Sequence, residues 1–464
     1  MIITRFAPSP TGYIHLGNIR TAFFCWLFVK QNNGKFLIRI DDTDNKRVLQ
    51  KYINDILNVL RWFKIDYDDD LIFQSKNKSQ YEIMLKQLIA TGYAYKCFCS
   101  KNRLTDLKNM QIKNKVKVKY DGRCLNLANK HDLDFVIRFK NNTCNKTSFF
   151  DLVKGLIEVS NLEFDDFIIA KNNFNPTYNF ACVVDDINYN ITHVIRGEDH
   201  ISNTIKQINL INALKRTVPK YVHLPMILDI NKNVLSKRRR ESNVMYYKTE
   251  GFLYQAILNY IIKLGWSFKN QEIFSIKEMI QLFNFKNINK SSCEINEKKL
   301  IWLNKYYMTH STTQSLYEQI IPIKKKIIIN YNLGPDIKTL IDIYKMRENT
   351  MKQIIISNFY LYIETIDIPD NYLEIFYETK IIIILLNIYA DIKNIKFKWE
   401  SNNIKIYVKN IININKISFS KLAIPLRILI TGCNNKKPIY DLFFLSGRIL
   451  LLKKIRHIIK RVNI

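Results

Sequence analysis

The chain has 464 residues, 47% of them hydrophobic, and 71 Lys and Arg against 41 Asp and Glu give it a formal net charge of +30. This apolar content excludes general disorder, and the length indicates about three or four domains. No apolar run approaches the roughly 18 residues of a membrane span, the first strand begins too early for a signal peptide, and eight Cys in so long a chain do not indicate a secreted disulfide framework. We therefore expect a cytoplasmic protein without membrane contact, whose positive charge favours a polyanionic partner.

The first forty-four residues have the order strand, loop, helix, strand. Residues 2–6 are a short apolar strand, and the Pro-rich residues 7–12 can continue neither a strand nor a helix. Apolar spacing then predicts a helix, and residues 35–40 predict a second strand. This order is typical of a nucleotide-binding βαβ unit, whose ligand lies beyond the carboxyl ends of the strands. His15 would lie at the helix N-terminus, where backbone amides attract phosphate, and Gly17 would leave room for a flat base.

Helical spacing continues after this unit. Apolar residues at helical intervals predict helices over residues 49–63 and about 79–91, and Gly92 is placed to end the second one. Residues 93–182 favour short strands and turns, as an insertion would. From residue 252 onward the composition predicts helices.

Three cysteines in the insertion form a candidate metal site. Cys97 and Cys99 are separated by one residue, and Cys124 follows farther along the chain. Thiolates at such a spacing are typical zinc ligands, although a structural zinc ion needs four ligands. The alternative is three ordinary thiols without metal, and the spacing leaves both interpretations open.

Two charged clusters follow the insertion. An apolar strand over residues 191–195 ends in residues 196–200, Arg-Gly-Glu-Asp-His, which bring a guanidinium group, two carboxylates and an imidazole to one strand end. By itself, a run of charge more often marks a solvated face. Residues 234–240, Val-Leu-Ser-Lys-Arg-Arg-Arg, form a basic loop suited to phosphate groups or to an RNA backbone.

In combination, these segments resemble the signatures of class I aminoacyl-tRNA synthetases. Residues 8–12, Pro-Ser-Pro-Thr-Gly, before residues 15–18, His-Leu-Gly-Asn, resemble the ATP-binding signature of the bacterial glutamyl-tRNA synthetase branch. Residues 196–200 resemble a signature of glutamyl- and glutaminyl-tRNA synthetases. Residues 234–238 resemble the mobile loop that class I enzymes close over the ATP phosphates, with Val in place of its first Lys. The resemblance covers about residues 2–310, with the three signatures in the expected order.

The resemblance implies a multidomain fold of class α/β plus all-α. A Rossmann-type catalytic domain, residues 1–92 and 183–240, would be interrupted by an acceptor-stem-binding domain, residues 93–182. A helical stem-contact domain would follow at residues 241–310, and a helical anticodon-binding region at residues 311–464.

The resemblance also implies an activity, a glutamate–tRNA ligase. Such an enzyme activates glutamate with ATP and Mg²⁺ to glutamyl-adenylate and transfers the glutamyl group to the 3′ end of tRNA-Glu. We expect it to act as a monomer. The implied ATP-binding residues are His15, Gly17, Asn18, Ser236 and Lys237. Of these, His15 and Lys237 are also implied to be catalytic.

Glutamate recognition needs cations for two carboxylates and an anion for the ammonium group. By resemblance, Arg5 and Tyr178 lie near the side-chain carboxylate, Arg196 lies near the α-carboxylate, and Ser9 lines the pocket. Asp41 would meet the ammonium group. It stands where bacterial glutamyl enzymes carry Glu and glutaminyl enzymes carry Asp, so glutamine is the competing substrate.

Some bacterial glutamyl-tRNA synthetases have a zinc site similar to the cysteine cluster. Their fourth ligand comes two residues after the third Cys, and here that residue is Asn126, a poor zinc ligand. His131 is a substitute if the loop allows it. Zinc therefore stays an open alternative to three free thiols.

A tRNA-modifying glutamyl transferase is disfavoured, because that branch lacks the distal helical arm predicted here. Three other functions compete with the glutamate–tRNA ligase. The first is a glutaminyl-tRNA ligase, or a non-discriminating enzyme that also charges tRNA-Gln. The second is a small-molecule nucleotidyltransferase, against which the basic C-terminal part argues, since residues 391–464 hold 16 Lys or Arg and three Asp or Glu. The third is a non-catalytic RNA-binding protein, which would bind tRNA without exchanging pyrophosphate into ATP.

Overall fold

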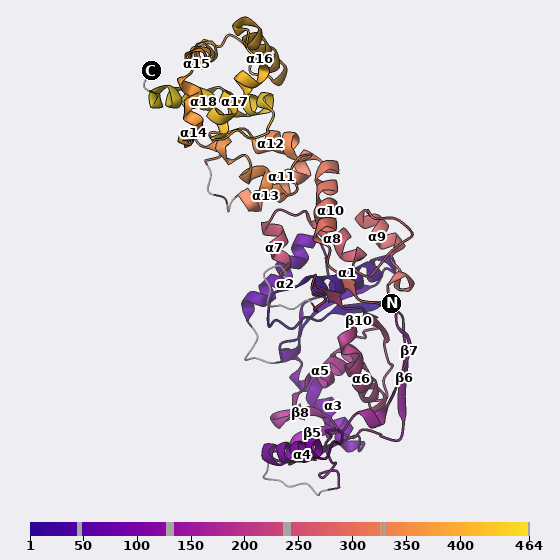
Figure 1. Ribbon diagram of the computed structural model, residues 1–464. Helices are drawn as coiled ribbons and strands as arrows, with labels where there is room; N and C mark the ends of the chain where they lie inside the picture. Colours follow the sequence, from indigo (N-terminus) through magenta and orange to yellow (C-terminus); the bar gives the residue numbers. More distant parts are fainter. Residues whose placement is uncertain (44–48, 127–133, 235–242, 325–326, 328–329, 463–464) are drawn as a thin grey trace. The chain divides into compact units, whose positions relative to one another are not determined.

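A computed structural model describes residues 1–43, 49–126, 134–234, 243–324, 327 and 330–462 (Figure 1). The chain forms two compact units. The first contains Met1–Tyr247 and Tyr254–Leu300, and the second contains Lys248–Leu253 and Ile301–Ile464. Among the described residues, no helix combines the length and the apolar character needed to cross a membrane.

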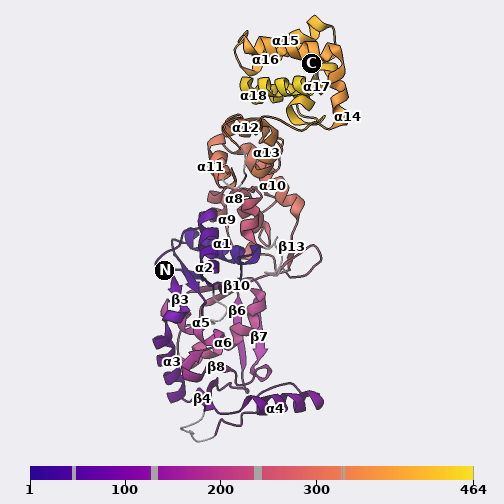
Figure 2. The same cartoon turned by 90° about the vertical axis from the view of Figure 1, so that its left-hand side faces the viewer.

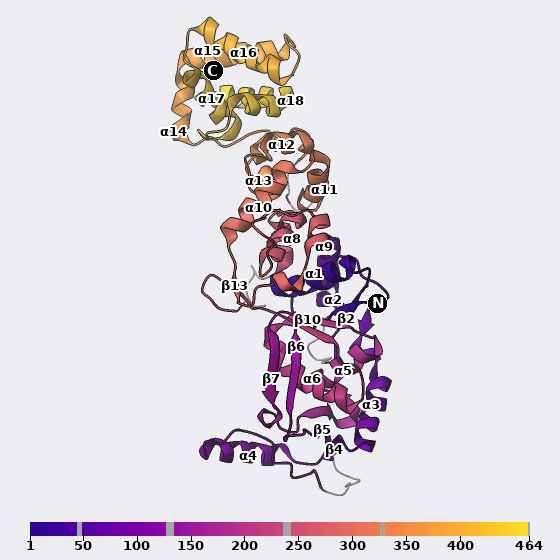
Figure 3. The ribbon, with the colours of Figure 1, turned by 90° about the vertical axis from the view of Figure 1, so that its right-hand side faces the viewer.

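A seven-stranded sheet with the order β3-β2-β1-β10-β11-β6-β7 organises the first unit. Its pairs are parallel except β6 with β7, an antiparallel hairpin that joins the edge of β11 and is seen side-on in Figures 2 and 3. Central parallel strands are buried on both faces, which is why several of these segments are mostly apolar. The strands are β1 (Ile3–Phe6), β2 (Lys35–Ile40), β3 (Ile72–Phe73), β6 (Lys146–Asp151), β7 (Gly155–Ser160), β10 (His193–Gly197) and β11 (Lys220–Leu224).

Helix α1 (Leu16–Gln31) connects β1 to β2, which confirms the predicted order of strand, loop, helix and strand. Ten of its 16 residues are buried, because it contacts β1, β2 and β10 as well as α8 and α9. Further elements of this unit are α2 (Gln50–Phe63), α3 (Lys78–Ala90), α4 (Lys101–Lys113), α5 (Tyr178–Asn188), α6 (Ile201–Ala213), α8 (Tyr254–Lys263), α9 (Ile276–Leu282), the parallel pair β12 (Ile227–Leu228) and β13 (Cys293–Glu294), and 3₁₀ turns at Gln74–Lys76, Asn161–Glu163, Asn172–Phe174, Glu198–His200 and Phe285–Asn287.

The segment predicted as an insertion contains a second sheet. It is antiparallel and has the order β4-β5-β8-β9. Helices α3, α5 and α6 share a buried apolar cluster with this sheet. Its strands are β4 (Ala94–Cys97), β5 (Val136–Phe139), β8 (Ile168–Lys171) and β9 (Asn175–Pro176).

Two details differ from the sequence prediction. Only strands and turns were predicted for the insertion, yet α4 forms there. None of its residues is buried, so this helix lacks the strong apolar face on which helix prediction depends. The boundary drawn between residues 182 and 183 falls inside the continuous helix α5. The division into catalytic and inserted domains stays a prediction.

The second unit contains helices and no strand in its described residues, in agreement with the predicted helical composition. Helices α15, α16 and α17 all pack against α18. Two helices, α7 (Val244–Thr249) and α10 (Glu297–His310), have residues in both units. The helices of the second unit are α11 (Thr313–Lys324), α12 (Ile337–Tyr344), α13 (Met351–Ile356), α14 (Asp370–Leu373), α15 (Thr379–Lys393), α16 (Ser401–Asn415), α17 (Phe419–Thr431) and α18 (Ile439–Arg461), with 3₁₀ turns at Phe359–Tyr362 and Glu374–Tyr377.

Candidate active site

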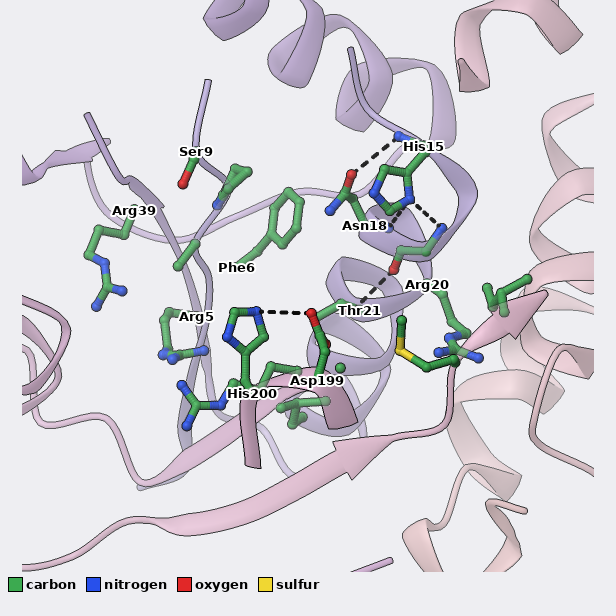
Figure 4. A pocket seen from close by; sticks show the side chains of 18 of the residues that line it. Arg5, Phe6, Ser9, His15, Asn18, Arg20, Thr21, Arg39, Asp199 and His200 are labelled. Atoms are coloured by element: carbon green, nitrogen blue, oxygen red, sulfur yellow. Dashed lines mark hydrogen bonds and ion pairs between the residues drawn. The ribbon is translucent and has the colours of Figure 1, made fainter. Parts of the chain in front are cut away.

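A pocket of about 420 Å³ opens at the carboxyl ends of β1 and β10 (Figure 4). Segments far apart in the chain form its wall, as the sequence predicts for a βαβ nucleotide fold. Asp41 is not on this wall. Ser236 and Lys237 lie outside the described residues, but Val234, two residues before Ser236, lines the pocket. The predicted site residues on the wall are Arg5, Ser9, His15, Gly17, Asn18, Tyr178 and Arg196.

His15 caps the N-terminus of α1. Its Nδ1 accepts hydrogen bonds from the backbone N–H groups of Gly17 (3.1 Å) and Asn18 (3.4 Å), and the Asn18 side chain accepts one from the His15 backbone (3.3 Å). An imidazole nitrogen that accepts cannot carry the ring proton, so that proton is on Nε2. His15 therefore satisfies two helix amides and keeps a donor on the opposite side of the ring.

Gly17 is needed for this cap. A Cβ atom at Gly17 would lie 3.0 Å from both Cε1 and Nδ1 of the His15 ring. The structure thus gives a reason for the glycine that differs from the predicted room for a base. The missing side chain makes space for the imidazole that holds the helix end.

Arg5 and Arg39 form the opposite side of the pocket, away from His15 (Figure 4). Both are held by Asp186, which accepts from Arg5 Nε at 3.0 Å and from Arg39 Nη1 at 2.7 Å. Burial acts to raise the pKa of Asp186, but the charges of Arg5 and Arg39 outweigh it and lower this pKa. Its carboxylate therefore stays ionised and keeps two guanidinium groups in place behind the pocket wall.

Asp41 lies behind Arg39. Its two carboxylate oxygens accept from Arg39 Nε (2.7 Å) and Nη2 (3.3 Å), and the residue is buried. Burial raises the pKa of Asp41, and the guanidinium group of Arg39 opposes that rise. The residue that the sequence assigns to the substrate ammonium group is thus engaged by an arginine that the sequence analysis did not single out.

Arg196 has one buried donor without a partner. Its Nη2 donates to the Thr204 hydroxyl (2.6 Å) and to Gln207 Oε1 (2.8 Å), and its Nε donates to His223 Nε2 (3.4 Å). Nη1 has no hydrogen-bond partner among the described residues, and the side chain lines the pocket. A buried guanidinium N–H left unpaired is costly, so this atom marks where an anionic group of a ligand would bind.

The charged cluster after β10 divides between the pocket and the sheet edge. Asp199 and His200 line the pocket, where the Tyr178 hydroxyl lies 3.4 Å from His200 Nδ1. Glu198 turns away, because its carboxylate accepts from the backbone N–H of Met226 (2.9 Å) and pairs with Lys154. The cluster is therefore not a simple solvated face.

The three cysteines come together as predicted. The sulfur atoms of Cys97, Cys99 and Cys124 lie within 4.8 Å of one another. The hydroxyl of Tyr120, a residue that the sequence analysis did not consider as a ligand, lies 3.4 Å from the sulfur of Cys97 and 3.6 Å from that of Cys99. His131 lies outside the described residues, and the amide of Asn126 is a poor zinc ligand. The cluster thus has a fourth polar atom that spacing could not reveal.

Comparisons with known proteins agree with this geometry. Residues 1–302 match the family "tRNA synthetases class I (E and Q), catalytic domain", and residues 315–459 match "Anticodon binding domain". The chain is 41% identical to the glutamate–tRNA ligase of Wigglesworthia glossinidia brevipalpis, over 99% of this chain and 98% of that one. It is 42% identical to the glutamate–tRNA ligase of Buchnera aphidicola subsp. Cinara cedri, over 100% of this chain and 98% of that one.

The fold has a close counterpart among solved structures. A glutamate tRNA ligase from Elizabethkingia meningosepticum, solved in complex with its amino acid, superposes with a TM-score of 0.84 at 24% identity and covers 99% of both chains. At this identity, the likeness establishes the fold alone.

Proposed function

The chain belongs to the class I tRNA synthetases of the glutamate and glutamine group, and from this premise we propose that it is a glutamate–tRNA ligase. Glutamate and ATP react to glutamyl-adenylate and pyrophosphate, and the terminal ribose hydroxyl of tRNA-Glu then takes the glutamyl group. The match of residues 315–459 to an anticodon-binding domain supports tRNA as the acceptor and argues against a small-molecule nucleotidyltransferase.

The observation that carries this proposal is the division of a single pocket into two ends. A capped helix N-terminus with His15 forms one end, and the guanidinium groups of Arg5 and Arg39 form the other. The helix end suits the ATP phosphates, and the arginines suit an amino acid with two carboxylates. One hollow can thus hold both reactants next to each other.

The first step needs alignment more than proton transfer. The attacking glutamate carboxylate is already an anion near pH 7, so no general base is required. Groups that face the growing negative charge on the phosphates lower the barrier instead. His15 can donate from Nε2, and we assign the ammonium group that meets the phosphates to Lys237, which follows Ser236 in the sequence, a role supported by the position of Val234 on the pocket wall. Mg²⁺ bound with ATP would neutralise further phosphate charge.

The amino-acid end supplies donors for both carboxylates. Asp186 accepts hydrogen bonds from Nε and Nη2 of Arg5. We infer that the other N–H groups of this guanidinium group, together with the Tyr178 hydroxyl, bind the side-chain carboxylate of the substrate. Nη1 of Arg196 suits the α-carboxylate. Asp41 stays our proposed ammonium partner, since each carboxylate oxygen can accept more than one hydrogen bond. Because it lies behind Arg39 and off the pocket wall, this role requires Arg39 to move aside when the substrate binds.

The test is charging of purified tRNA-Glu and tRNA-Gln with labelled glutamate and glutamine. We expect ATP-dependent attachment of glutamate to tRNA-Glu. A Lys237→Ala variant should remain folded and lose activity by orders of magnitude. Charging with glutamine alone would replace the proposal by a glutaminyl-tRNA ligase, and tRNA binding without ATP–pyrophosphate exchange in the presence of tRNA would leave an RNA-binding protein. Light scattering at the 55.2 kDa of one chain would support a monomer.

Zinc in the cysteine cluster is a separate proposal. Three thiols within 4.8 Å of one another can supply three ligands of a tetrahedral zinc ion. The Tyr120 hydroxyl beside them is a weaker candidate for the fourth ligand, because burial and the neighbouring thiols raise its pKa and keep it protonated. Elemental analysis of freshly purified protein should give about one zinc per chain, and less in a Cys99→Ser variant. Under half an equivalent in the wild type would indicate three free thiols.

A further inference from the structure

A buried pair of side chains lies directly behind Arg196. Arg196 in β10 and His223 in β11 are partners in the parallel register. His223 and Asp151 are fully buried. The Asp151 carboxylate is 2.7 Å from His223 Nδ1 and 3.0 Å from its backbone nitrogen. The sequence analysis singled out neither residue, because they are 72 positions apart.

Asp151 fixes the protonation of the His223 ring. An ionised carboxylate only accepts hydrogen bonds, so Nδ1 carries the ring proton and Nε2 is an acceptor. Nε2 lies 3.4 Å from Arg196 Nε and 2.8 Å from the Thr204 hydroxyl. A proton on Nε2 would turn this acceptor into a donor that faces a guanidinium group. Burial, with the nearby charge of Arg196, keeps the pKa of His223 below its usual value.

The same contacts fix the direction of the guanidinium group. His223 engages Nε of Arg196, while Thr204 and Gln207 engage Nη2. Only Nη1 is left without a partner among the described residues, on a side chain that lines the pocket. Loss of the His223 acceptor would let the guanidinium group turn in its plane and would move Nη1 away from the ligand.

Asp151 is itself anchored in the β6–β7 hairpin. Its second oxygen accepts from the backbone N–H groups of Val153 (2.9 Å) and Lys154 (2.8 Å) in the turn that follows β6. One carboxylate therefore ties the hairpin to β11 and, through His223, to Arg196.

We propose that Asp151 and His223 are positioning residues for the amino-acid substrate, which hold Arg196 so that Nη1 meets the α-carboxylate. This role rests on the proposed function, in which Arg196 binds that group. Neither residue touches the substrate, so their removal should weaken amino-acid binding and leave ATP binding unchanged.

The main test is the isosteric variant Asp151→Asn. Asn has a single acceptor oxygen, so it cannot serve both the His223 ring and the hairpin amides, and the ring is free to take the other tautomer. We expect KM for glutamate to rise at least about tenfold, the usual scale for a weakened charge-assisted hydrogen bond, while KM for ATP changes by less than about twofold. Asp166→Asn is the matched control. Asp166 also accepts two partly buried hydrogen bonds in the inserted segment, from the Tyr95 hydroxyl and the backbone N–H of Asn141, and does not contact Arg196.

Two further variants separate positioning from general stability. His223→Gln keeps an acceptor near Arg196 Nε and should retain more affinity for glutamate than His223→Leu, which has none. Ring ¹⁵N spectra of histidine-labelled wild type should show His223 with its proton on Nδ1, identified by the signal that His223→Gln removes. In Asp151→Asn the proton should move to Nε2.

The outcomes are distinct. Unchanged KM for glutamate in Asp151→Asn, or the Nε2 proton in the wild type, would overturn the positioning role. A fall in kcat while KM for glutamate and KM for ATP stay unchanged would show a structural role instead. If the wild type uses glutamine, the proposed function fails, but the positioning role is still tested, since both amino acids carry the α-carboxylate. If the wild type charges tRNA with neither amino acid, the affinity for glutamate of the wild type and of Asp151→Asn is compared by calorimetry. Weaker binding by the variant would support the positioning role, and equal binding would overturn it.

Discussion

The buried arginines Arg5 and Arg39 behind the pocket and the buried Lys454 of the second unit are stabilised differently. In the first unit, Arg5 and Arg39 share the Asp186 carboxylate, and Arg39 also holds Asp41 through two hydrogen bonds. In the second unit, Lys454 of α18 is 2% exposed, and its Nζ donates to the backbone carbonyls of Tyr360 (2.9 Å) and Ile430 (2.7 Å). No carboxylate pairs with Lys454 among the described residues.

The difference shows where the protein retains charge. Arginines that are paired with carboxylates stay ionised, so the pocket can bind an anion. Burial without a counter-charge lowers the pKa of Lys454 to about 7. About half of the Lys454 side chains are therefore uncharged near pH 7, and they still donate hydrogen bonds as neutral amines. Charge is therefore preserved in the arginine cluster behind the pocket and is partly given up at Lys454.

The largest effect is expected from Asp186→Asn. This variant keeps the shape of the side chain but removes the charge shared by Arg5 and Arg39. Breaking a buried ion pair by removing one partner costs about 3–5 kcal/mol, so the free energy of unfolding of the first unit should fall by that amount. Urea titration followed by tryptophan fluorescence measures the change, and glutamate charging should fall with it.

Asp69→Asn is the matched control for this experiment. Asp69 pairs with Lys35 on the surface, where the two side chains are 56% and 39% exposed. An exposed pair contributes at most about 1 kcal/mol, so this variant should unfold almost as the wild type does. Equal losses in the two variants would contradict the importance of the buried arginine pairing.

A smaller, pH-dependent effect is expected from Lys454→Met. The pKa of Lys454 is about 7 in the folded chain and near 10.5 when unfolded, so between these values the unfolded state binds more protons. The free energy of unfolding of the wild type should therefore rise with pH relative to the variant, by about 2 kcal/mol between pH 7.5 and pH 9. Urea titrations of both proteins at the two pH values give this difference.

A flat difference would show that Lys454 keeps its charge in the folded state. A paired, stabilised ammonium group would titrate only above pH 10.5 and would give the same flat result. That result would remove the contrast between Lys454 and the arginine cluster.

Local features of the chain predicted the outline of the fold. The strand at residues 35–40 has the observed bounds of β2, and the helix predicted at 49–63 differs from α2 by one residue, because apolar spacing and the flanking polar residues mark them. The end of α3 at Gly92 is confirmed, since this glycine has a φ of +77° and donates to the carbonyl of Ile89.

The charge network behind the pocket was not predictable in the same way. Arg5 and Asp186 are 181 positions apart, and only the folded sheet brings them together. Two signals were present nonetheless. Arg39 interrupts a run of apolar residues in its strand, and Asp185 and Asp186 follow another apolar run. Charged side chains in such buried segments require partners of opposite charge. The pairing itself could not be assigned, so the sequence does not reveal that Arg39 is a partner of Asp41.

The smallest effect is expected at the helix end, from Gly17→Ala. The added Cβ would lie 3.0 Å from the His15 ring, so the ring must shift by a few tenths of an ångström and its hydrogen bonds to the Gly17 and Asn18 amides weaken. A weakened cap costs about 1 kcal/mol, so KM for ATP should rise by roughly fivefold while KM for glutamate stays the same. Steady-state charging with each substrate varied in turn measures both values. If the glycine is instead required for a base to approach, the methyl group would fill that space, and ATP binding would fall far more steeply. The size of the change in KM for ATP therefore distinguishes support of the imidazole from direct contact with the nucleotide.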